Sequence, residues 1–137
     1  MDTLYALPRE EAKQLFACRT PDSLRAFVAT LAKNVSVAKV ELSSSGVALH
    51  QALTGGDEPS AGEYPLNHVV LGGRPLIGEA DCTVILKRPD MAGHIVTALA
   101  DVQLQSPDLE PMLKRVAAFY QAAAVGGCAV VLVRATS

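Results

Sequence analysis

The chain has 137 residues, half of them hydrophobic, and a formal net charge of only −2. This length suits a single domain with a buried core, which we expect to span residues 1–137. The small net charge argues against general nucleic-acid binding, and the apolar content argues against a disordered chain. Three scattered cysteines, with no CxxC or CxxxC spacing, indicate reduced thiols rather than a disulfide framework.

The amino-terminal residues MDTLYALPREEAKQ lack the apolar core of a secretory signal. No segment of the chain reaches membrane-spanning length. We therefore expect a cytoplasmic protein without a membrane partner.

The first half of the chain alternates between short extended segments and helices. The elements predicted there are an edge strand at 2–8, helices at 9–19, 21–34 and 43–55, and a short extended segment at 36–42. Pro8 and Pro21 suit helix starts, and Thr20 is a typical N-cap. Ser43 to Ser45 predict a cap for the third helix, and Gly55 predicts its left-handed end.

The second half begins with a loop at 55–65, rich in Gly, Pro, Ser and carboxylates. The elements predicted after it are a short helix or strand at 66–76 that turns at Gly72-Gly73, a strand at 83–86, helices from Pro89 and from 107–125, and a strand at 128–134. The last strand is an apolar run, typical of a central strand covered on both faces. The sequence predicts one α+β domain, rich in helix, with a small sheet.

The Gly72-Gly73 turn resembles a phosphate-binding loop only superficially. A Walker loop needs Lys-Ser or Lys-Thr after its last glycine, whereas Arg74-Pro75 follows here. Pro75 also lacks the backbone N–H that a phosphate nest requires. The sequence has no third glycine at the position that a Rossmann fingerprint requires. We interpret the segment as a structural turn.

No catalytic or metal-binding set stands out among the titratable residues. The three histidines have neither HxH nor HxxxH spacing. We expect His50 to be a core residue, His94 to be exposed, and His68 to face a cleft. Cys128 begins a buried strand, which should raise its pKa and make the thiol inert. We expect no catalytic residue, metal or cofactor.

One segment of the chain is much more acidic than the chain as a whole. Five carboxylates and a single cation, Arg74, lie between residues 56 and 81; the carboxylates are Asp57, Glu58, Glu63, Glu79 and Asp81. These side chains either belong to a solvated loop that keeps the protein soluble, or form an acidic surface that attracts a basic partner. In the second interpretation Tyr64 would be an amphipathic anchor.

The chain resembles the YfbM-like family of small bacterial proteins, which is a domain of unknown function. The resemblance runs from about Leu42 to Val133 and rests on four stretches: ALHQALTG, PLNHVVLGGRPLIGEAD, the Pro-Asp helix start at Pro89, and LKRVAAFYQAAAVGGCAVVLV. His50 falls on the family's histidine before the Leu-Thr-Gly turn. Gly46-Val47 stand where the family commonly has a bulky pair such as Trp-His, and the family's segment after the Gly-Gly turn is usually longer. The resemblance implies a fold but little about a reaction.

The leading hypothesis from the sequence is a binding protein without catalysis, which occludes a protein partner. Its most concrete form is an immunity protein that neutralises a basic toxin surface through Asp57, Glu58, Glu63, Tyr64, Glu79 and Asp81. The alternative is an enzyme that binds a small molecule or nucleotide in a cleft near His50, His68 and Arg74. A homodimer formed through an exposed helix face is a third possibility.

Overall fold

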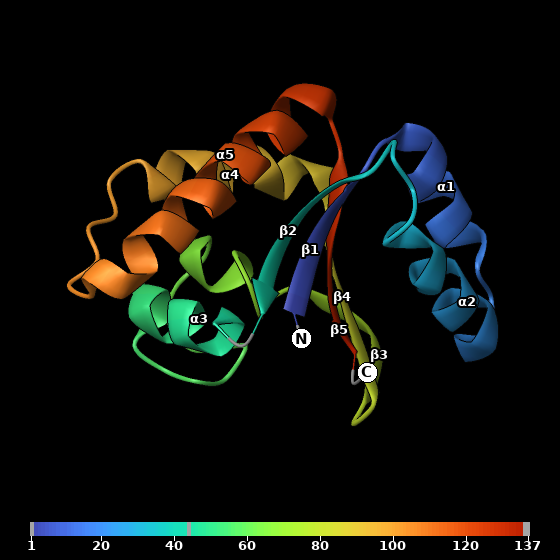
Figure 1. The fold of residues 1–137 in the computed structure, drawn as a ribbon, viewed down its shortest axis with the longest axis horizontal. Coiled ribbons are helices and arrows are strands. Elements are labelled where there is room, and N and C mark those ends of the chain that lie inside the picture. Colours follow the sequence, from blue (N-terminus) through green and yellow to red (C-terminus); the bar gives the residue numbers. More distant parts are fainter. Residues whose placement is uncertain (1, 44, 136–137) are drawn as a thin grey trace.

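The computed structural model describes residues 2–43 and 45–135, which fold around a five-stranded sheet (Figure 1). The sheet has the order β2-β1-β5-β4-β3, and each neighbouring pair is antiparallel. The strands are β1 (Asp2–Leu7), β2 (Ala38–Ser43), β3 (Arg74–Glu79), β4 (Cys82–Lys87) and β5 (Ala129–Ala135). The predicted α+β class is confirmed.

Helices cover both faces of the sheet (Figure 1). One layer consists of α1 (Arg9–Ala17) and α2 (Pro21–Leu31). The other consists of α3 (Gly46–Thr54), α4 (Pro89–Leu99) and α5 (Glu110–Gly126), with short 3-10 turns η1 (Leu66–His68) and η2 (Pro107–Leu109). Among the described residues, no helix combines the length and apolar character that a membrane span needs.

Two hydrophobic clusters lie on the two faces of the sheet because strand side chains alternate between them. In β5, Val130 and Leu132 belong to the cluster under α3, α4 and α5. Val131 and Val133 belong to the cluster under α1 and α2. Burial on both faces agrees with the prediction of a central carboxy-terminal strand, and β5 lies third of the five strands.

Two predictions about individual elements were wrong, and one strand was not predicted. β1 is an interior strand between β2 and β5, because its residues are buried on both faces rather than one. Ser45 precedes α3 but makes no side-chain capping bond. Residues 74–79 form β3, an edge strand that the sequence pattern did not indicate. The predicted caps at Thr20 and Gly55 are confirmed, since Thr20 forms a capping box with Ser23 and Gly55 has φ 85°.

Candidate functional site

The Gly72-Gly73 turn is held by a buried lysine. Lys87 ends β4 on the same face as Ile85, is only 1% exposed, and points toward the α3–α5 layer. Its Nζ donates hydrogen bonds to the carbonyl oxygens of Val70, at 2.8 Å, and Gly72, at 2.7 Å. Burial lowers the pKa of Lys87 to about 7, because the interior disfavours the charged form. A neutral amine has two N–H groups, which match these two carbonyls.

The same turn requires both glycines because other backbone atoms come very close to it. A Cβ on Gly72 would lie 2.1 Å from the Asn67 carbonyl oxygen, and a Cβ on Gly73 would lie 2.5 Å from that of Leu86. Gly73 also has φ 138°, where a side chain is strained. On the other side, the buried Tyr120 hydroxyl donates to the Val69 carbonyl. The turn is therefore a packed corner and not a phosphate cradle.

Three aromatic side chains from separate elements meet beside this corner. Tyr64, at the end of the loop after α3, packs edge-on against His68 of η1 at 5.1 Å and His94 of α4 at 5.9 Å between ring centroids. The Tyr64 hydroxyl and His94 Nδ1 also share a hydrogen bond of 2.8 Å. Tyr64 nevertheless remains 48% exposed. The result is an exposed tyrosine whose orientation is fixed from two sides.

His68 faces a small cavity of about 260 Å³, as the sequence suggested. The cavity is lined by Pro59, Ser60, Asn67, His68, Gly72 and Gly73. His68 Nδ1 donates to Asn67 Oδ1 at 2.7 Å. Burial is the main cause that lowers the pKa of His68, and the nearby cationic groups of Lys87 and Arg88 lower it further.

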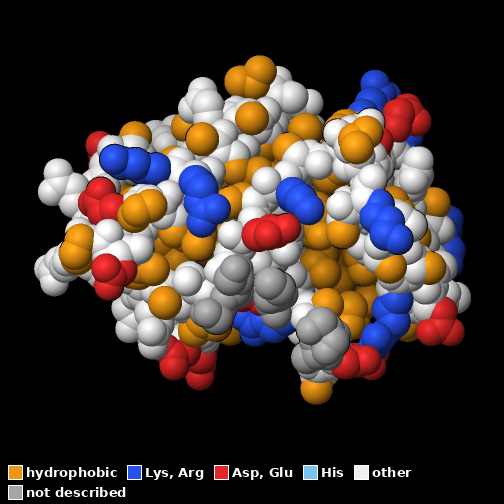
Figure 2. Space-filling view, in the orientation of Figure 1, with side chains coloured by type: hydrophobic (Ala, Val, Ile, Leu, Met, Phe, Trp, Pro, Cys, Tyr) orange, Lys and Arg blue, Asp and Glu red, His pale blue; other side chains and the backbone are white. Residues whose placement is uncertain are grey.

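Residues 56–64, here called the acidic loop, carry three of the predicted partner-binding carboxylates. Asp57, Glu58 and Glu63 are all exposed, and none forms an ion pair with a described residue. Asp57 accepts a hydrogen bond from Gln51. Figure 2 shows acidic side chains at the lower left of the molecule, where Figure 1 places this loop.

Glu79 and Asp81 lie elsewhere, at the β3–β4 hairpin. Arg25 of α2 bridges both of them, at 2.8 Å to Glu79 and 3.2 Å to Asp81. The Arg25 guanidinium lowers the pKa of Asp81. The hairpin and the acidic loop are separate in Figure 1. The structure thus divides the six predicted residues into two groups and pairs the carboxylates of one group with an arginine of the protein itself.

The residues of the alternative, enzymatic hypothesis do not share a cleft. His50 is fully buried, and its Nε2 donates to the Glu58 carbonyl at 2.7 Å. Its Nδ1 has no hydrogen-bond partner among the described residues. His68 lines the small cavity, whereas Arg74 lines a different cleft under α1 and α2. His50 instead fixes the start of the acidic loop against α3.

The cysteines are free, and the described residues contain no group of three or more His, Cys, Asp or Glu placed to hold a metal ion. Cys82 is buried, whereas Cys18 and Cys128 are partly exposed. Burial is the main cause that raises the pKa of Cys128, as predicted.

Comparison with known proteins places this geometry in a family. The family model of DUF1877, described as a domain of unknown function, matches residues 1–110. The chain belongs to the DUF1877 family. The match includes the first forty residues, whereas the resemblance in the sequence motifs begins at about Leu42.

The DUF1877 fold is also seen in a solved structure. The crystal structure of YfbM from Escherichia coli, a protein of unknown function, matches with a TM-score of 0.67 and 17% sequence identity. The match covers 97% of this chain and 99% of that chain. No curated protein matches. At this identity the similarity shows a common fold, so function must be argued from the site.

The sequence did not reveal the buried Lys87 or the two histidines that hold Tyr64. One signal for Lys87 exists: it has the same strand parity as Ile85, so it must point to a covered face. No comparable signal links Tyr64 to His94, because thirty residues, one 3-10 turn and two strands separate them.

Proposed function

We propose that this DUF1877 protein is a non-catalytic binding protein that contacts a basic protein surface through its acidic loop. In its most concrete form it is a cytoplasmic immunity protein that occludes a cognate bacterial toxin. One observation carries the proposal: an exposed, oriented Tyr64 lies at the end of a loop with three carboxylates that have no ion-pair partner among the described residues.

Orientation matters because ordering a side chain on binding costs free energy. Tyr64 is already held by two rings and a hydrogen bond, so less of that cost remains when a partner covers it. Tyrosine is enriched among the residues that dominate interface energetics, because it combines a large apolar ring with a polar hydroxyl.

The surrounding charge supports a basic partner. Asp57, Glu58 and Glu63 form no ion pair with any residue that the structure describes, unlike Glu79 and Asp81, which Arg25 already binds. Carboxylates free of internal ion pairs attract arginine and lysine and speed association with a surface that carries them. An interface of about 800 Å² per partner is ample for such occlusion.

Site-specific photocrosslinking tests this proposal in cells of the source organism. A benzophenone amino acid replaces Tyr64 in one variant and Val125 in the control, since Val125 is also an exposed hydrophobic residue, at 82%. We expect a discrete crosslink to one basic protein from position 64 and none from position 125. Toxicity of that protein, relieved by co-expression of this chain, is expected for the immunity form.

Two crosslinking results contradict the proposal. One is an absence of position-specific adducts at residue 64. The other is a crosslink only to a second copy of the chain, which would identify the loop as a homodimer interface instead.

A further inference from the structure

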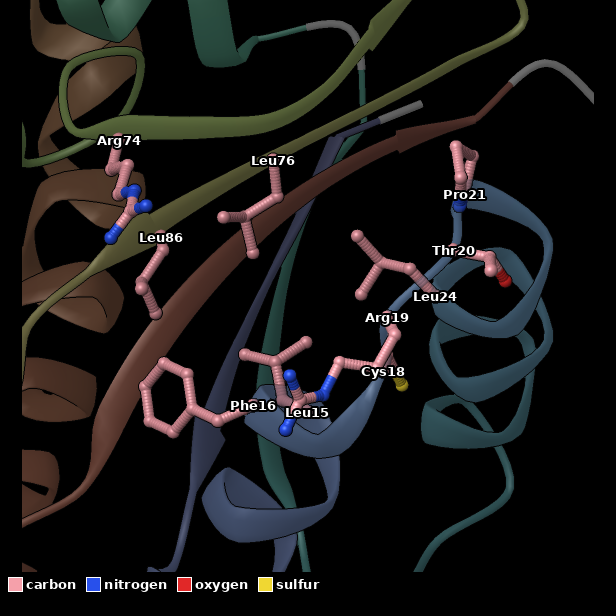
Figure 3. Close-up of a pocket in the computed structure, with 10 residues that line it drawn as sticks. All are labelled: Leu15, Phe16, Cys18, Arg19, Thr20, Pro21, Leu24, Arg74, Leu76 and Leu86. Atoms are coloured by element: carbon pink, nitrogen blue, oxygen red, sulfur yellow. The ribbon is translucent and has the colours of Figure 1, made fainter.

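A second cleft lies on the opposite face of the sheet, under α1 and α2 (Figure 3). Its volume is about 330 Å³, which is at the lower end of the range for small-molecule sites. Leucines from the α1–α2 layer and from the sheet form its walls; they are Leu15, Leu24, Leu76 and Leu86. Phe16 lies at its side and is 57% exposed.

An irregularity in the edge strand helps to form the cleft. The β3–β4 register shifts between Pro75 and Ile77, so that Leu76 has no opposite residue in β4. Such bulges redirect side chains. Leu76 and Ile77, although adjacent, both pack on the cluster under α1 and α2. The bulge therefore adds one apolar side chain to the wall of the cleft.

Two arginines extend into the cleft from different elements. Arg19 comes from the α1–α2 connection and Arg74 from the start of β3, and both line the cleft. Figure 3 shows the Arg74 guanidinium beside Leu86 and the Arg19 side chain extending toward Phe16. Neither forms an ion pair with a described residue, and no carboxylate lines the cleft. Arg25, on the same helical layer, has two internal carboxylate partners. The positive charge of Arg19 and Arg74 is therefore available to a ligand.

We propose that this cleft binds a small amphipathic carboxylate, with its carboxylate between Arg19 and Arg74 and its apolar body against Leu24, Leu76 and Leu86. The planar guanidinium matches a carboxylate through two parallel hydrogen bonds, which selects an anion. The leucine walls select an apolar body, because transfer of methylene groups from water to these walls is favourable. A ligand with only one of these features gains only part of the binding free energy.

The test uses octanoate as the probe and 1-octanol as its uncharged counterpart. Binding is followed by methyl NMR of the full chain, with the Leu24, Leu76 and Leu86 signals as reporters. We expect saturable shifts of these signals with octanoate and at least about tenfold weaker binding of octanol, since a charged hydrogen bond is lost. Arg19→Gln and Arg74→Gln should each weaken octanoate binding by about tenfold.

Arg88→Gln is the matched control, because Arg88 is an exposed arginine at the start of α4, on the other helical layer. It should bind octanoate as the wild type does. The proposal is overturned if octanol binds as tightly as octanoate, if the arginine variants bind normally, or if the shifts fall outside the cleft.

This site is independent of the proposed function. A chain with the acidic loop reversed in charge should still bind octanoate, so failure of one proposal leaves the other testable.

Discussion

In a Lys87→Met variant, the free energy of unfolding at pH 9 is expected to be about 2–4 kcal/mol lower than in the wild type. Lys87 provides the amine that binds the carbonyls of Val70 and Gly72 inside the protein. Methionine fills much of the same space but donates no hydrogen bond, so both buried oxygens lose a partner. Because Val70 is fully buried, water does not readily replace the donor there. Urea unfolding followed by circular dichroism measures the difference.

The size of this loss should depend on pH in a defined direction. The pKa of Lys87 is about 7 in the folded protein, against about 10.4 in an unfolded chain. Between these values the unfolded state holds one more proton, so wild-type stability gains up to about 1.4 kcal/mol per pH unit as pH rises. Below pH 7 both states are protonated and the gain disappears. The variant lacks this contribution, so the loss should grow by about 2–3 kcal/mol from pH 7 to pH 9.

Lys39→Met provides the control, because Lys39 is an exposed lysine of β2. Its effect should stay within about 0.5 kcal/mol and should not change over the same pH range. Lys87→Arg should destabilise more than Lys87→Met does, since arginine remains charged and is larger. A pH-independent loss for Lys87→Met would show that the buried amine does not titrate between pH 7 and 9.

Replacing Tyr64 with Ala should weaken binding to the partner captured at that position by about 30-fold or more. The fall should arise mainly from faster dissociation, because a buried anchor is lost while the charges that steer association remain. Stability should change little, since Tyr64 is half-exposed and lies in a loop. Surface-binding kinetics measures both rate constants.

Tyr64→Phe and His94→Ala separate the ring from its orientation. Tyr64→Phe keeps the ring but loses the hydrogen bond to His94, and His94→Ala removes one of the two rings that hold Tyr64. Each should weaken binding by a smaller factor than Tyr64→Ala. Equal binding by Tyr64→Ala and wild type would remove Tyr64 from the interface.

The parts of this fold that depend on local chemistry were predictable from the sequence. The apolar run at 129–133 indicated the central strand β5, and Gly55 marked the end of α3. Each signal acts within a few residues of the feature that it predicts, through side-chain alternation or a left-handed backbone. The order of helices and strands predicted from such local signals was sufficient to indicate the α+β class.

The parts that depend on distant residues were not predictable. β3 has the sequence RPLIGE, with a proline and a glycine, and it is a strand because it pairs with β4. The sequence placed Glu79 and Asp81 in one acidic surface with the loop carboxylates. In the fold, Arg25 of α2 lies next to both and forms ion pairs with them. Lysine at a strand end is usually solvated, so the parity that Lys87 shares with Ile85 is outweighed in the sequence until the packed turn is seen to cover the amine.

The association rate of the captured basic partner tests the central claim most directly. Asp57, Glu58 and Glu63 are reversed to Lys in one variant, and Glu10, Asp22 and Glu41, also exposed, are reversed in a control matched in charge change. At low salt, the loop variant should associate at least about tenfold more slowly than the control, and added salt should narrow that gap. Equal association rates for the two variants would contradict the acidic loop as the partner-binding surface.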